Sequence, residues 1–184
     1  MQKTGTLPMI LAAVRFAADR HRNQRRKDAA ATPYVNHPVC VAETLVNIGG
    51  IEDPQVVCAA LLHDTIEDTD TTADELAEAF GPAVRDIVLE VSDDKSLSKE
   101  KRKQEQIRHA ATASTAAKQV KLADKICNLQ DILAHPPADW SDERKRKYFE
   151  WAKAVVDQVR GASPALEARF DALYREGMER FGGK

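Results

Sequence analysis

The chain has few cysteines and no long apolar run. Its three cysteines, Cys40, Cys58 and Cys127, lie far apart in 184 residues and form no CxxC pair. This spacing excludes a zinc knuckle and a disulfide framework, so we expect reduced core cysteines in a cytoplasmic protein. No apolar run approaches the roughly 20 residues that a membrane-spanning helix needs. We therefore expect no association with a membrane.

An excess of charge of one sign is also absent. The 27 Lys and Arg residues nearly balance 29 Asp and Glu residues, and the formal net charge is −2. The chain thus lacks the bulk basicity of a nucleic-acid-binding protein, and an anionic ligand would require positive charge to be concentrated locally. Aromatic residues make up only 5%, but 43% hydrophobic residues exclude a disordered chain.

Apolar residues recur at helical spacing along most of the chain, and we find no run of alternating strands. Asp53-Pro54 marks the start of one helix, Thr72 and Pro82 start two more, and Gly49-Gly50 and Gly81 mark helix ends. Expected helices cover about 8–22, 39–48, 54 into the sixties, 72–80, 82–91, 98 onward, 116–133, 148–159 and 166–181. The prediction is an all-α helical bundle of about eight to ten helices, forming one domain over residues 1–184.

The segment LLHDTIEDTDTT, residues 61–72, places one histidine and four acids directly after the apolar stretch VVCAALL. On a continuous helix, His63 would share a face with Glu67, and Asp64 with Asp68. A solvated helix end is the simplest alternative. However, carboxylates are unfavourable at a helix C-terminus, and crowded carboxylates need a cation to offset their repulsion. Imidazole with carboxylate favours manganese, iron or zinc over calcium.

One helix rarely supplies a whole coordination sphere, so we looked for further ligands. His37 lies in YVNHP just before a helix, and Asp124 interrupts the apolar run VKLADKICNL. A buried carboxylate needs a partner, which a metal or a lysine can provide. The alternatives are a capping or core role for His37 and a buried ion pair of Asp124 with Lys121 or Lys125. The residues by themselves leave these alternatives open.

Together these segments resemble the HD-type hydrolase domain of the RelA/SpoT alarmone enzymes. Three signature blocks occur in the family's order: HRNQRRKD…PYVNHP, LLHDTIEDTDTT and VKLADKICNL. The similarity continues through VSDDKSLSKEKRK and WSDERKRKYFEWAKAVV, and spans about residues 8–160. It is strongest to the small metazoan alarmone hydrolases, which lack a synthetase domain. We therefore expect one HD-type hydrolase domain and no synthetase domain.

The resemblance implies one Mn²⁺ per chain, held by His37, His63, Asp64 and Asp124. It implies that Glu67 and Asp68 serve the attacking water. The reaction would remove the 3′-pyrophosphate from guanosine 3′,5′-bis(diphosphate), ppGpp, to give GDP, and from pppGpp to give GTP. The resemblance also maps substrate contacts onto Arg26, Lys27, Asn128, Lys99, Arg144 and Tyr148. Ligand type ranks metals only loosely, so other divalent ions remain open.

Three points qualify this expectation. Gln130 stands where the family often has arginine, which removes one fixed positive charge near the nucleotide or its phosphates. The metazoan relatives are also credited with removing the 2′-phosphate of NADPH, so an NADPH 2′-phosphatase or related ribose-phosphate hydrolase is the alternative. A catalytically inactive nucleotide-binding protein is a third reading, and the presence of all four ligands and of Glu67-Asp68 argues against it. The oligomeric state stays open.

Overall fold

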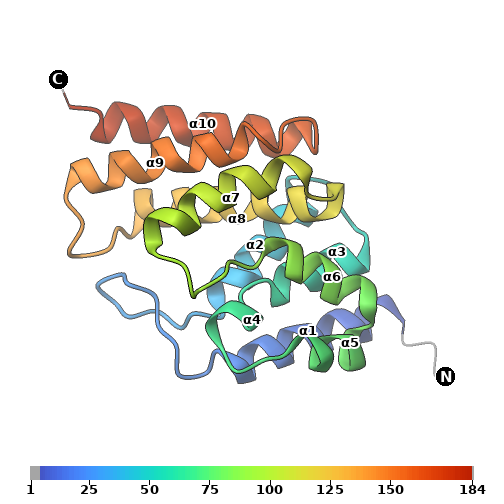
Figure 1. Cartoon of the computed structure of the whole chain (residues 1–184). Coiled ribbons are helices and arrows are strands. Elements are labelled where there is room, and N and C mark those ends of the chain that lie inside the picture. The colour runs from blue at the N-terminus through green and yellow to red at the C-terminus, as the bar shows by residue number, and fades with distance from the viewer. Residues whose placement is uncertain (1–4, 184) are drawn as a thin grey trace.

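A computed structural model describes residues 5–183, and over that range the chain forms helices and no strand (Figure 1). The helices are α1 (Thr6–Arg20), α2 (Asn36–Asn47), α3 (Pro54–Leu62), α4 (Thr65–Asp68), α5 (Ala73–Phe80), α6 (Pro82–Val91), α7 (Lys99–Thr112), α8 (Thr115–Ala134), α9 (Asp142–Val156) and α10 (Pro164–Phe181). Isolated β-bridges join Arg25 to Pro33 and Asp28 to Pro137. The all-α prediction and the expected number of helices are confirmed.

Local capping explains where several helices begin. The Asp53 carboxylate accepts the Gln55 N–H, and Pro54 occupies the first helical position of α3. Thr72 and Glu75 form a reciprocal capping box at the start of α5. At the starts of α7, α8 and α9, the hydroxyls of Ser98, Ser114 and Ser141 each accept a backbone N–H three residues later. Four of these five starts lie within one residue of the expected position, whereas α9 begins at Asp142, six residues before the expected start at 148.

The segment that contains His63 differs from the expected continuous helix. Helix α3 ends at Leu62, and the short helix α4 begins at Thr65. The His63 ring donates to the Ala60 carbonyl at 2.7 Å, and the Thr65 hydroxyl donates to the Leu62 carbonyl at 2.7 Å. Side chains thus satisfy carbonyls at the end of α3 that a continuous helix would pair with backbone N–H groups. The prediction of one continuous helix through this motif was wrong.

Helix α8 lies at the centre of the bundle and packs against α2, α3, α6, α9 and α10. Figure 1 shows α9 and α10 side by side along one edge, with α1 and α5 at the opposite edge. Because α8 also contacts α2 and α3, residues from three distant parts of the sequence meet beside it. Among the described residues, no helix has both the length and the apolar character needed to cross a membrane.

Candidate active site

Four side chains from three regions of the chain converge at the meeting point of α2, α3 and α8. His37 Nε2 lies 3.1 Å from an Asp124 oxygen, and His63 Nε2 lies 3.0 Å from an Asp64 oxygen. The crossed distances are 3.9 Å for His37 to Asp64 and 3.8 Å for His63 to Asp124. The ligand atoms of His37, His63 and Asp124 all lie within 4.8 Å of one another. One small cation can therefore lie among His37, His63 and Asp124, and Asp64 faces both histidines.

The orientation of His63 fits a metal ligand. A carbonyl can only accept, so the contact with Ala60 places a proton on Nδ1, and in the neutral ring the Nε2 lone pair faces the carboxylates. His63 is buried, and its Nε2 lies 3.0 Å from an Asp64 oxygen without a well-aligned hydrogen bond. In the neutral ring, a buried lone pair beside carboxylates is unfavourable, and a divalent cation among these groups would satisfy both.

The charges of this group favour cation binding. Burial raises the pKa of Asp64, but the facing His63 and His37 outweigh burial and hold the pKa below its ordinary value. Burial also raises the pKa of Asp124, but Lys125 and His37 outweigh this effect and hold the pKa well below its ordinary value. Burial lowers the pKa of His63, whereas Asp64 raises it, to about 9 in the absence of a cation. Both carboxylates are therefore ionised at neutral pH.

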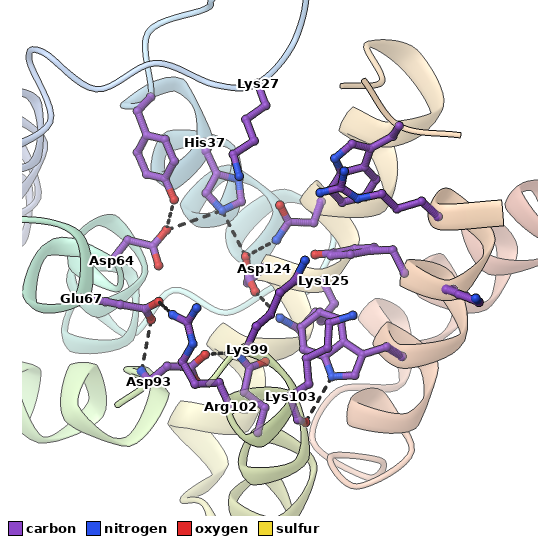
Figure 2. Close-up of a pocket in the computed structure, with 18 of the residues that line it drawn as sticks. Lys27, His37, Asp64, Glu67, Asp93, Lys99, Arg102, Lys103, Asp124 and Lys125 are labelled. Atoms are coloured by element: carbon purple, nitrogen blue, oxygen red, sulfur yellow. Dashed lines mark hydrogen bonds and ion pairs between the residues drawn. The ribbon is translucent and has the colours of Figure 1, made fainter. Parts of the chain in front are cut away.

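Further side chains hold the two carboxylates in place (Figure 2). The Tyr34 hydroxyl donates to Asp64 Oδ2 at 2.5 Å. Lys125 Nζ donates to Asp124 Oδ2 at 2.9 Å, and Asn128 Nδ2 donates to Asp124 Oδ1 at 2.6 Å. The lysine pairing considered as an alternative for Asp124 is thus present, but it occupies only one carboxylate oxygen and leaves the other facing the histidines.

The two acids of the Glu67-Asp68 pair have different surroundings. Glu67 lines the cavity beside the ligand group, accepts the Asp93 N–H at 3.1 Å and lies 4.0 Å from Arg102. Burial, followed by the charge of Asp93, raises the pKa of Glu67 to about 7. Asp68 instead accepts from Gln24 Nε2 at 2.8 Å and pairs with Lys95. Of the two acids, Glu67 is the one placed beside the metal ligands.

A cavity of about 580 Å³ opens onto this group, and in its wall cationic side chains outnumber the five acidic ones, Asp64, Glu67, Asp93, Asp124 and Glu143 (Figure 2). Seven cationic side chains line it: Lys27, Lys99, Arg102, Lys103, Lys125, Arg144 and Lys147. They come from the loop after α1 and from α7, α8 and α9, which surround the cavity. The aromatic rings of Trp140, Tyr148 and Trp151 complete the wall. The chain of net charge −2 therefore carries the local positive charge that an anionic ligand requires.

Most of the expected substrate contacts line this cavity, and Arg26 does not. Lys27, Lys99, Asn128, Arg144 and Tyr148 all lie in its wall. The Arg26 guanidinium instead pairs with Asp131 at 2.5 Å and contacts Asn128 at 3.3 Å, beside a neighbouring cavity of about 470 Å³.

Residues shared by the two walls link these cavities, namely Lys27, Tyr34, Asn128, Trp140 and Tyr148. Gln130 lines neither of them. It follows Asn128 by two positions on α8, and residues two apart do not share a helix face.

Several wall residues were missed by sequence reasoning, although helical spacing carried a signal for some. Arg102, Lys103 and Gln106 follow Lys99 at intervals of three or four along α7. Lys147 and Trp151 continue the face of Arg144 and Tyr148 on α9. Extending each candidate along its own helix face would have found them. Tyr34 and Asp93 reach the site only through contacts between distant segments.

Comparisons with known proteins agree with this geometry. A family model described as HD domain matches residues 13–150. A zebrafish protein named guanosine-3′,5′-bis(diphosphate) 3′-pyrophosphohydrolase MESH1 is 51% identical over 168 residues, which cover 91% of this chain and 93% of its own length. The human protein of the same name is 50% identical, with 91% and 93% covered.

A solved structure shares the fold over the same extent. It is described as a metazoan ortholog of SpoT that hydrolyzes ppGpp, and it matches with a TM-score of 0.89 and 46% identity over 91% of this chain and 94% of its own. A longer relative from Aquifex aeolicus, also named a guanosine-3′,5′-bis(diphosphate) 3′-pyrophosphohydrolase, is 36% identical over 75% of this chain but only 19% of its own length. This chain belongs to the HD-domain family, in the group that contains the metazoan SpoT-like hydrolases.

Proposed function

We propose that this hydrolase is a guanosine-3′,5′-bis(diphosphate) 3′-pyrophosphohydrolase, which converts ppGpp to GDP and pyrophosphate and pppGpp to GTP and pyrophosphate. The observation that carries this proposal is the basic cavity that opens directly onto the histidine and carboxylate group. Such a cavity suits a small nucleotide with several phosphates. The relatives that bear this activity in their names are about half identical to the chain over nine-tenths of its length.

Membership of the HD-domain family implies a divalent metal, and the donor set of His37, His63 and Asp124 fits one. We propose one Mn²⁺ per chain, held by these residues and Asp64, as the resemblance to the alarmone hydrolases implies; mixed nitrogen and carboxylate ligands suit manganese, iron and zinc alike. When bound, such a metal polarises a phosphoryl oxygen and lowers the pKa of a nearby water.

Glu67 is the proposed general base. Its carboxylate lines the cavity, and its pKa of about 7 lies near neutral pH, where a base both exists in its ionised form and accepts a proton well. The Asp93 N–H binds Oε2 at 3.1 Å, and Oε1, which lies 4.0 Å from Arg102 Nη1, is the oxygen proposed to accept the proton of the attacking water. Asp68, expected to share this task, pairs with Gln24 and Lys95. We assign Asp68 a positioning role for the segments that border Glu67.

The cationic wall is the proposed phosphate-binding surface. Lys27, Lys99 and Arg144 reach the cavity from three different elements, so they can neutralise phosphates on different sides of one nucleotide. Tyr148 and Trp140 offer ring faces on which a purine base can stack. Arg26, held by Asp131 in the neighbouring cavity, would act on the part of the substrate that enters there. A cytoplasmic location stays a prediction.

A comparison of two substrates tests the proposal. The Mn²⁺-loaded chain is given ppGpp or NADPH under the same conditions, and pyrophosphate and inorganic phosphate are measured. We expect pyrophosphate release from ppGpp, with a higher kcat/KM than phosphate release from NADPH. Asp64→Ala is the matched control and should abolish turnover of both substrates while keeping its helical circular dichroism. Turnover of NADPH alone would replace this proposal with the 2′-phosphatase, and full activity of Asp64→Ala would overturn the metal assignment.

A further inference from the structure

Two cysteines face each other across the contact between α2 and α8. The Sγ atoms of Cys40 and Cys127 lie 2.9 Å apart, and both residues are free thiols. Cys127 is buried, whereas Cys40 is only half-buried. The Thr44 hydroxyl lies 3.4 Å from the Cys127 sulfur. The two thiols are therefore held together, and solvent can reach one of them.

The thiol pair lies directly beside the proposed metal ligands. Cys40 follows His37 by three residues on α2, and Cys127 follows Asp124 by three residues on α8. Residues three apart share a helix face, so the sulfur contact is the next layer of the interface that brings His37 within 3.1 Å of Asp124. A bond between the sulfurs would tie together the two helices that supply these ligands.

We propose that Cys40 and Cys127 form an oxidative modification site, at which a peroxide produces an intramolecular disulfide that clamps α2 to α8 beside the metal ligands. A disulfide bond is about 2.05 Å long, so the sulfurs need to approach by only about 0.9 Å from their present 2.9 Å. The proposal requires that rotations of the two side chains supply this approach while α2 and α8 keep their packing.

The reaction balances with hydrogen peroxide as the oxidant. The half-buried Cys40 thiolate attacks one peroxide oxygen, the O–O bond breaks, and Cys40 becomes a sulfenic acid with release of water. Cys127 then attacks the Cys40 sulfur, the S–O bond breaks, and a second water leaves. In total, two thiols lose two hydrogen atoms and two electrons, and one peroxide is reduced to two waters. A dithiol reductant reverses the cross-link by thiol–disulfide exchange.

Cys58 provides an internal comparison. It is also a free thiol, but it is buried, and burial raises its pKa to about 11. No other cysteine contacts it among the described residues. We therefore expect Cys58 to stay reduced under conditions that oxidise the pair, because its thiol is buried and has no partner sulfur with which to form a disulfide.

Peptide mapping of the full chain tests the proposal. The Mn²⁺-loaded protein is treated with a small excess of hydrogen peroxide, alkylated, digested without reductant and analysed by mass spectrometry. We expect a linked peptide that joins Cys40 to Cys127, a monomer lighter by two hydrogen atoms, and full reversal by dithiothreitol. Cys58→Ser should give the same cross-link, whereas Cys40→Ser should give none.

Thermal unfolding of the oxidised and reduced wild-type chain supplies a second readout that needs no variant. A disulfide that closes a long loop without strain should raise Tm by on the order of 5–10 °C. The proposal is overturned if the thiols stay free or become sulfinic acids, or if the disulfide joins two chains. It is equally overturned if the linked protein has a lower Tm, because the sulfurs would then have been forced together.

Discussion

Glu67 and Asp68 are adjacent in sequence, but their side chains contact different neighbours. Glu67 lines the basic cavity and has a raised pKa, whereas Asp68 accepts a hydrogen bond from Gln24 and forms an ion pair with Lys95. Consecutive residues of a helix point about 100° apart, so Glu67 and Asp68 at the end of α4 face different neighbours. Their adjacency in the motif therefore does not make them functionally equivalent.

Glu67→Gln should lower kcat by about 10²–10⁴, since it removes a general base but keeps the shape of the side chain. The variant should retain its bound Mn²⁺, measured by elemental analysis, because Glu67 is not one of the four proposed ligands. Asp68→Asn is the matched control and should reduce kcat much less. An unchanged kcat in Glu67→Gln, or a larger loss in Asp68→Asn, would contradict this division of roles.

The pH dependence of kcat should follow the ionisation of Glu67. A base must be deprotonated to act, so activity is full above its pKa and falls about tenfold per pH unit below it. Burial and Asp93 raise this pKa to about 7, and a bound cation would lower it again. We expect an acid limb with a midpoint at or below pH 7 that disappears in the residual activity of Glu67→Gln. A limb that persists unchanged in that variant would assign the pKa to another group.

Tyr34 makes a separate prediction about metal binding. Its hydroxyl donates to Asp64 Oδ2, so Tyr34→Phe removes a group that orients a proposed ligand but leaves the ligand itself. Changes of this kind typically weaken metal affinity 10–100-fold. Titration calorimetry with Mn²⁺ measures the effect, and Tyr174→Phe in α10 makes the same chemical change away from the site. Equal Mn²⁺ affinity in the two variants would remove Tyr34 from the metal site.

At the scale of helices, the sequence predicted positions better than contacts. The caps at Asp53, Thr72 and Ser98 are short-range features, so the helix starts could be read from neighbouring residues. The break at His63 could not, because it depends on which side chains bond the carbonyls at the end of α3. Hydrophobic periodicity indicates only that apolar residues continue at helical spacing through this segment.

The packing of α9 against α10 gives a prediction about stability. Gly177 on α10 lies against the Phe149 ring, and a Cβ added there would overlap that ring. Gly177→Ala should therefore destabilise the fold by about 1–3 kcal/mol, even though alanine favours a helix. Chemical denaturation measures the difference, and the neighbouring exposed residue provides the control Glu176→Ala, which should be nearly neutral. Stabilisation by Gly177→Ala would contradict the close packing of these helices.

At the scale of the whole molecule, the site is assembled from segments far apart in sequence. His37 and Asp124 are 87 positions apart and meet at 3.1 Å. Neither residue has a local pattern that distinguishes a ligand from a buried partner, and only the resemblance to a family grouped them. For Arg26, in the loop after α1, the motif predicted a substrate contact but could not predict the pairing with Asp131, which depends on tertiary packing.

The distribution of charge also belongs to this scale. A net charge of −2 does not show where positive charge lies on the molecule. The arrangement of α7, α8, α9 and the loop after α1 concentrates seven cationic side chains around one cavity. That arrangement, together with the carboxylates and histidines at the base of the cavity, is the physical basis of the proposed activity.

The most direct test is product analysis with the metal-stripped chain. The protein is freed of metal with a chelator, re-supplied with Mn²⁺ alone and incubated with ppGpp, and the products are separated by ion-exchange chromatography. The account predicts no turnover without metal and, with Mn²⁺, equal amounts of GDP and pyrophosphate. Full turnover without metal, or release of inorganic phosphate in place of pyrophosphate, would contradict it.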